Sequence, residues 1–244
     1  MIRKGYRLEG AGATDIGCQR SRNEDSFLLN PEAGLWLVAD GMGGHAAGDV
    51  ASRTITEAMA GLDPAPTPER QHAAFHARLD AAQDAILQHS RELGGVPVGA
   101  TMAALLIHGL GFACIWAGDS RVYQLRDGVL RQVTTDHTEA EALVQAGTLS
   151  RAEADRWPRR GLVTRAVGIA PDRATEVVAG FLAPGDTFLL CSDGLTEHVT
   201  DPEIAQILAA LPPESACTML IEQTLARGAL DNVTAVVVRC HLSD

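Results

Sequence analysis

Apolar residues recur along the chain with two periods, and the period in each segment predicts its secondary structure. Continuous or alternating apolar runs are typical of strands, and they lie at 6–13, 26–29, 35–39, 101–107, 111–117, 122–126, 162–168, 175–182, 187–191 and 233–240. Apolar residues three and four apart predict helices over 46–62, 68–93, 201–210 and 213–226. Thr67-Pro68 and Asp201-Pro202 mark two helix starts, because a capping side chain followed by proline suits a first turn.

Short turns predict that neighbouring strands pair as hairpins, 26–29 with 35–39 and 101–107 with 111–117. The segment 138–162 is polar and mostly helical, and it interrupts this order. We interpret it as a flap beside a site, although a segment of this kind can also simply cover a sheet edge. Antiparallel strand pairs combined with helix pairs favour an α+β fold.

Several predicted strands stop at an acidic residue or begin just after one. The acids at these positions are Glu24, Asp25, Asp40, Asp119, Asp193 and Asp231. Because sheets place their strand ends along one edge, we expect these carboxylates to cluster. One such acid alone would be an ordinary Asp-Gly turn or a solvated loop, and the repetition is what indicates a site.

Clustered ionised carboxylates need cations or strongly raised pKa values when they lie within about 4–6 Å of each other. A ligand set of oxygens favours Mg²⁺, Mn²⁺ or Ca²⁺. Two such ions can share a water and activate it as hydroxide for in-line attack on phosphorus. Arg20 lies one short loop before Glu24 and could hold two phosphate oxygens. His45 could protonate the leaving oxygen, or it could be an ordinary surface or packed histidine.

The glycine-rich loop after Asp40 does not match other phosphate-binding motifs. It lacks the Gly-Lys-Ser/Thr of a P-loop, and its glycine spacing differs from a dinucleotide fingerprint. Gly118-Asp119-Ser120 is not part of a Gly-x-Ser-x-Gly esterase motif, so Asp119 rather than Ser120 fits the pattern of the other loops.

The composition narrows the class of protein. A chain of 244 residues that is 46% hydrophobic suits one domain spanning 1–244. A net charge of −11 argues against nucleic acid and anionic membrane as partners. Five scattered cysteines without a Cys-x-x-Cys pair indicate neither a zinc site nor a disulfide framework. Without an apolar leader or a spanning segment, we expect a cytoplasmic protein, monomeric by default.

Eight short motifs in order along the chain resemble the metal-dependent PPM (PP2C-type) serine/threonine protein phosphatases in their short bacterial form. They are Thr14-Asp15-Ile16-Gly17 with Arg20 and Asn23-Glu24-Asp25, Asp40-Gly41-Met42-Gly43-Gly44-His45, Gly99-Ala100-Thr101, Gly118-Asp119-Ser120-Arg121, Thr135-Asp136-His137, Thr164-Arg165-Ala166-Val167-Gly168, Ser192-Asp193-Gly194-Leu195 and Asp231-Asn232-Val233-Thr234. The resemblance covers nearly the whole chain. Departures are small: Thr14 stands where serine is frequent, and Ala229 where a second glycine is usual.

The resemblance implies a centre of two Mn²⁺ or Mg²⁺ ions. Asp40 would bridge both ions, Gly41 would offer its carbonyl to one, and Asp25 would orient metal-bound water. The remaining ligands of the pair would be Glu24, Asp193 and Asp231.

A third ion is implied at Asp119 together with Asp193. Arg20 would bind the substrate phosphate, and His45 would be the general acid.

The fold implied is a four-layer α/β/β/α sandwich of two mainly antiparallel sheets flanked by helix pairs, with the flap beside the site. The activity implied is metal-dependent hydrolysis of phosphoserine and phosphothreonine in proteins, reversing a cognate Ser/Thr kinase. Two alternatives stay open: a non-catalytic module that binds phosphoproteins, and a hydrolase of small phosphoesters.

Overall fold

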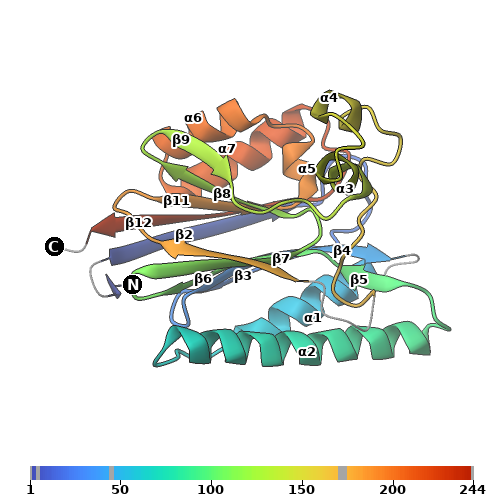
Figure 1. Ribbon diagram of the computed structural model, residues 1–244, viewed down its shortest axis with the longest axis horizontal. Coiled ribbons are helices and arrows are strands. Elements are labelled where there is room, and N and C mark those ends of the chain that lie inside the picture. The colour runs from blue at the N-terminus through green and yellow to red at the C-terminus, as the bar shows by residue number, and fades with distance from the viewer. Residues whose placement is uncertain (1, 4–5, 44–46, 170–174, 243–244) are drawn as a thin grey trace.

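The computed structural model describes residues 2–3, 6–43, 47–169 and 175–242, and it is built of four layers in the order helix, sheet, sheet, helix (Figure 1). All strand pairs in both sheets are antiparallel within this part of the chain. The first sheet has the order β1 (Ile2–Arg3), β2 (Tyr6–Asp15), β12 (Val233–Leu242), β11 (Thr187–Cys191), β8 (Arg121–Arg126) and β9 (Val129–Gln132). The second has the order β10 (Glu176–Phe181), β7 (Gly111–Ala117), β6 (Met102–His108), β4 (Leu35–Gly43) and β3 (Asp25–Asn30), and β5 (Val98–Ala100) pairs with β4.

Helices cover the outer face of each sheet. The second sheet is covered by α1 (Gly48–Ala60) and α2 (Pro68–Glu92), whereas α6 (Asp201–Ala210) and α7 (Pro213–Ala226) cover the first (Figure 1). The predicted α+β sandwich is therefore confirmed. None of the helices in the described ranges is both long and apolar enough to cross a membrane.

Three apolar clusters fill the spaces between the four layers, and β4 contributes side chains to two of them. Its side chains alternate, so that Leu35 and Leu37 pack with the helices α1 and α2, while Trp36 and Val38 pack between the sheets. A strand buried on both faces reads as the continuous apolar run seen in the sequence. The third cluster joins the first sheet to α6 and α7.

Most predicted elements are confirmed within a few residues, and both helices after residue 200 have the predicted bounds. Three predictions are wrong. The strand predicted at 35–39 continues through Gly43, because β5 pairs with its glycine-rich end. No strand forms at 162–168, where only isolated bridges occur at Val163 and Val167. Thr200 rather than Asp201 caps α6, in a capping box with Glu203.

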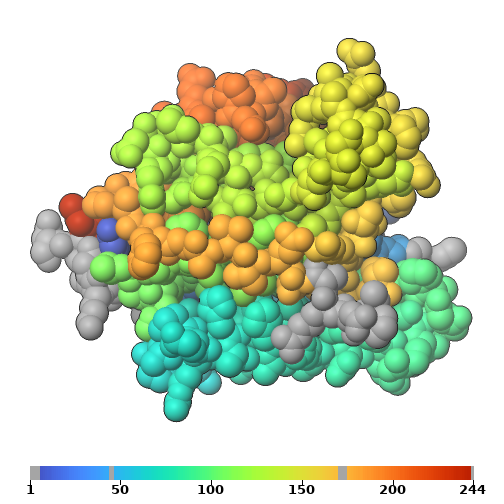
Figure 2. All heavy atoms as spheres, in the orientation of Figure 1, coloured from blue at the N-terminus to red at the C-terminus, as the bar shows by residue number. Residues whose placement is uncertain are grey.

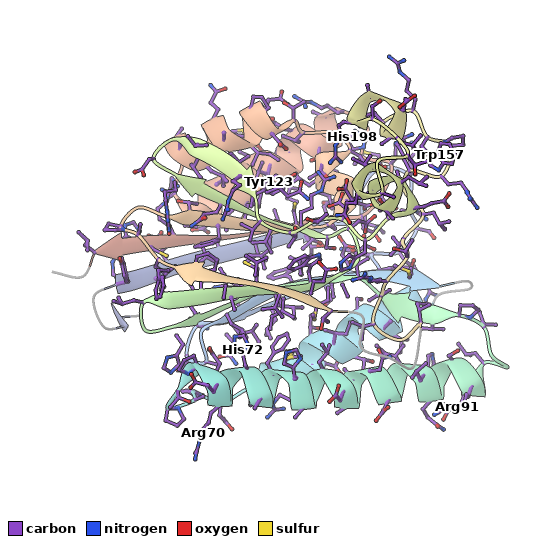
Figure 3. The ribbon with its side chains drawn as sticks, viewed as in Figure 1. Arg70, His72, Arg91, Tyr123, Trp157 and His198 are labelled. Atoms are coloured by element: carbon purple, nitrogen blue, oxygen red, sulfur yellow. The ribbon has the colours of Figure 1, made fainter. Side chains whose placement is uncertain are left out.

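The flap, residues 138–162, leaves the body of the protein and rejoins it at nearly the same place. It contains α3 (Glu139–Gln145) and α4 (Arg151–Ala154), and it forms the lobe that stands out in yellow in Figure 2. Its two ends meet in a bridge between Thr138 and Val163. Inside the flap, Glu139 accepts hydrogen bonds from Trp157 Nε1 at 3.2 Å and from Arg159 Nη2 at 2.6 Å (Figure 3 labels Trp157).

Candidate metal centre

The fold brings most of the predicted acids to one end of the two sheets. Asp25 and Asp40 face each other across β3 and β4 as paired residues. Asp193 follows β11 as the first residue of the short helix α5 (Asp193–Thr196), and Asp231 lies two residues before β12. Asp119 lies in the turn between β7 and β8. The strand-end pattern therefore places carboxylates from both sheets beside one another.

Burial and mutual repulsion raise the pKa values of four of these acids. Burial is the largest cause in each case, and neighbouring carboxylates add to it. The pKa of Asp25 rises to about 7, that of Asp119 to about 8 and that of Asp193 to about 6. The pKa of Asp40 rises well above its ordinary value, because burial raises it and the charges of Asp25, Asp193, Asp119 and Asp231 add to this effect. Such a cluster calls for protons or cations to neutralise it.

Glu24 lies at the edge of this group, beside the start of α1. Burial raises its pKa, and the nearby carboxylate of Asp49 raises it further. Its backbone is fixed by Asn232, whose Oδ1 accepts the Glu24 N–H at 2.7 Å. The Asn232 amide also donates to the carbonyls of Ile16 and Arg22, so one side chain holds the loop that carries Arg20.

Gly41 permits a close approach of three backbone segments. A Cβ at this position would lie 2.6 Å from the carbonyl oxygen of Glu24, and closer still to that of Gly48. The Gly41 N–H donates to the same Glu24 carbonyl at 3.1 Å. The absent side chain therefore lets the glycine-rich end of β4 pack between the acidic loop and α1.

Arg20 contacts one of the predicted metal ligands. Its Nη2 lies 2.5 Å from Oδ2 of Asp231, and its side chain is 53% exposed. Asp231 and, more weakly, Glu24 and Asp40 raise the pKa of Arg20 above its ordinary value. The guanidinium therefore stands at the solvent side of the acidic group, where it can reach an anion. His45, the predicted general acid, lies outside the described residues.

The donor set fits hard divalent cations, because every described side chain in the group offers carboxylate oxygens. Asp25 also has a buried oxygen, Oδ1, with no hydrogen-bond partner in the described structure. The side chains are nevertheless not arranged as a coordination sphere: among the described residues, no three His, Cys, Asp or Glu side chains form a group that could hold an ion. The pairing of Arg20 with Asp231 shows one contact that a cation would have to replace.

An open cavity of about 380 Å³ lies between the flap and the acids. Asp119 and Asp193 line it on one side, and Arg151 and Arg160 of the flap line the other. The segment 138–162 and two of the predicted acids therefore line the same cavity.

Two hydroxyl groups beside Asp25 have no role in the strand-end pattern of acids. Ser192 Oγ and Thr234 Oγ1 both donate to Asp25 Oδ2, at 2.8 and 2.6 Å. Both residues belong to the motifs quoted above, each close in sequence to an acid. Their contact with Asp25 depends on the pairing of strands far apart in the chain, which no local pattern reveals.

The architecture and the strand-end carboxylates together define a four-layer α+β protein with an acidic centre at one end of its sheets. The chain belongs to the Protein phosphatase 2C family, whose family model matches residues 18–227.

Relatives with assigned names support the same family. Serine/threonine protein phosphatase PstP of Mycobacterium tuberculosis is 38% identical over 240 residues, which are 97% of this chain and 46% of the relative. This chain thus spans about half the length of that protein. Serine/threonine phosphatase stp of Listeria monocytogenes is 32% identical over 241 residues, covering 94% of this chain and 95% of the relative.

Solved structures share the fold. PppA of Pseudomonas aeruginosa, described as a key regulatory component of T6SS, has a TM-score of 0.88 at 38% identity and covers 97% of this chain and 99% of its own. The catalytic domain of a serine/threonine protein phosphatase PstP in complex with two manganese ions has a TM-score of 0.84 at 36% identity, and the match covers 96% of this chain and 98% of that one.

Proposed function

We propose that this chain is a Mn²⁺- or Mg²⁺-dependent protein phosphatase that hydrolyses phosphoserine and phosphothreonine. The observation that carries the proposal is the buried carboxylate cluster at one end of the sheets, in a chain that belongs to the Protein phosphatase 2C family. The PstP catalytic domain with two manganese ions supports the choice of metal. A phosphorylated protein and its cognate Ser/Thr kinase are the proposed partners.

Each acid has a proposed place in the centre. Asp40 would bridge two ions, and the Gly41 carbonyl would bind one of them. The other ligands would be Glu24, Asp193 and Asp231, with Asp25 orienting bound water, and a third ion would lie at Asp119 and Asp193. When bound, such ions supply activated water for in-line attack on phosphorus.

The chain's own groups would bind the substrate and move its protons. The Arg20 guanidinium would leave Asp231 and hold two oxygens of the phosphoryl group, as its planar fork suits a tetrahedral anion. The leaving serine or threonine oxygen needs a proton, and the proposed donor is His45. The flap cavity would hold the residues around the phosphorylated side chain.

Four buried free cysteines support a reducing, cytoplasmic location.

The experiment that tests this function is phosphate release from a phosphothreonine peptide, with Mn²⁺, with Mg²⁺ and with chelator. We expect turnover only with metal, and its loss in Asp193→Asn. Asp63→Asn, an exposed acid in the connector between α1 and α2, is the matched control. A wild type that binds Mn²⁺ but releases no phosphate would instead support a phosphoprotein-binding module. A preference for para-nitrophenyl phosphate over the peptide would support a hydrolase of small phosphoesters.

A further inference from the structure

Asp25 is held on one side by two buried hydroxyl groups. Ser192 and Thr234 are fully buried, and both donate to the same carboxylate oxygen, Oδ2. The other oxygen, Oδ1, is buried and receives no hydrogen bond in the described structure. The two oxygens therefore have separate surroundings: one is saturated by the protein, and the other is left for a ligand.

The hydrogen bonds around Thr234 have one direction when Asp25 is ionised. A carboxylate only accepts, so the single hydroxyl hydrogen of Thr234 must point to Asp25 Oδ2. Thr234 Oγ1 then accepts from Thr14 Oγ1 at 2.8 Å, and Thr14 in turn accepts from Asn23 Nδ2 at 2.9 Å. The chain closes on itself, because Asn23 Oδ1 accepts from the Asp25 N–H at 3.1 Å.

Ser192 forms the second branch, at a position where its hydroxyl would ordinarily serve a helix. It is the N-cap residue of α5, yet its side chain makes no capping hydrogen bond. The Ser192 hydroxyl instead accepts from the Thr234 N–H at 3.0 Å and donates to Asp25. The Ser192 hydroxyl therefore binds a buried carboxylate instead of capping α5, which indicates a role beyond the stability of that helix.

We propose that Thr234 and Ser192 are positioning residues that fix the Asp25 carboxylate, so that Oδ1 alone faces the metal centre. The register of β12 with β2, which pairs Thr234 with Thr14, sets the geometry. The proposal rests on the proposed function in one respect, namely that the free oxygen of Asp25 serves a metal and its bound water. Partners that orient a metal-binding side chain typically change metal affinity or activity by about 10–100-fold when they are removed.

The decisive variant is Thr234→Val, which keeps the shape of threonine and removes only the hydroxyl. Valine suits a strand, so folding should survive the change. The variant Thr234→Ser restores the hydroxyl. The control is Thr224→Val in α7, where an equally buried threonine hydroxyl donates only to the Leu220 carbonyl.

Mn²⁺ affinity by calorimetry, turnover of a phosphothreonine peptide and the melting temperature would be measured for each protein. We expect Thr234→Val to lose about 10–100-fold in Mn²⁺ affinity or in kcat, and Thr234→Ser and Thr224→Val to match the wild type in both. Equal affinity and kcat in Thr234→Val and wild type would overturn the proposal. So would an equal loss in Thr224→Val, which would show that any buried hydroxyl matters.

A failure of the proposed function would give different results from a failure of the positioning role of Thr234 and Ser192. A wild type that binds Mn²⁺ without releasing phosphate would overturn the enzyme, while the affinities of Thr234→Val and Thr234→Ser would still decide the role of the hydroxyls. A wild type that binds no Mn²⁺ would overturn both.

Discussion

The carboxylate cluster predicts that the protein freed of metal by chelator loses stability as the pH rises. Burial and the charge of Asp193 raise the pKa of the Asp119 carboxyl to about 8 in the folded protein, whereas an unfolded chain leaves it at about 3.9. Between these values the folded protein keeps a proton that the unfolded chain has released. Raising the pH therefore favours unfolding, and the stabilisation present below about pH 4 is lost by about pH 8.

The size of the effect follows from the pKa difference. Each pH unit inside this window costs about 1.4 kcal/mol, so Asp119 alone removes about 4 kcal/mol between pH 5 and pH 8. In a domain of this length, that loss lowers the melting temperature by about 8–16 °C. Asp25 and Asp193, with pKa values of about 7 and about 6, change stability in the same direction over part of the range.

Melting curves in chelator at pH 5, 6, 7 and 8 would measure this slope, for the wild type and for Asp119→Asn. We expect the variant to have a flatter slope, because it lacks the titrating group, and Asp63→Asn to keep the full slope. Mn²⁺ should restore the stability of the wild type at pH 8, since a cation replaces the lost protons. A wild-type melting temperature that stays constant from pH 5 to pH 8 in chelator would refute the reasoning.

Three further substitutions test separate features of the structure. Arg20→Lys should raise KM for a phosphopeptide about tenfold, because the ammonium group of lysine cannot bind two phosphate oxygens in the bidentate geometry of a guanidinium. An unchanged KM in steady-state kinetics would contradict this. Gly41→Ala should lower the free energy of unfolding by about 1–3 kcal/mol in urea titrations, because its Cβ meets the Glu24 carbonyl. Asp186→Ala should lower it by about 1–3 kcal/mol, because this buried carboxylate accepts from Arg126 at 2.5 and 2.6 Å and from Gln124; equal urea midpoints would disprove either effect.

Periodicity predicted the helices well because each buries one continuous stripe. The strand predicted at 162–168 shows the opposite case. Its apolar residues are spaced as in a strand, yet Val163 and Val167 make only isolated bridges, one at the end of the flap and one to Ala100. The local sequence shows that these residues are apolar. Whether they anchor a loop or extend a sheet depends on tertiary contacts, which the local sequence does not contain.

The clustering of the acids was predictable because most of them lie next to a strand end; Asp40 follows the apolar run of β4, although the strand itself continues through Gly43. Their arrangement was not, since it depends on which strands pair. Thr14 and Thr234 are direct partners across β2 and β12, but they are 220 residues apart in sequence. Pairing at this distance is a property of the complete fold, and so the hydroxyl groups that hold Asp25 could not be found from the motifs that contain them.

The two ends of the flap meet at one place, so its length and sequence are structurally independent of the strand pairing in the sheets. The Glu139 N–H donates to the Leu162 carbonyl at 3.0 Å, and the Thr164 N–H donates to the His137 carbonyl at 2.7 Å. The chain thus leaves and re-enters the body at one place, and the entropy of closing such a loop grows only slowly with its length. Insertions, deletions or a transplanted flap could therefore change what the cavity admits without shifting a single strand register beneath it.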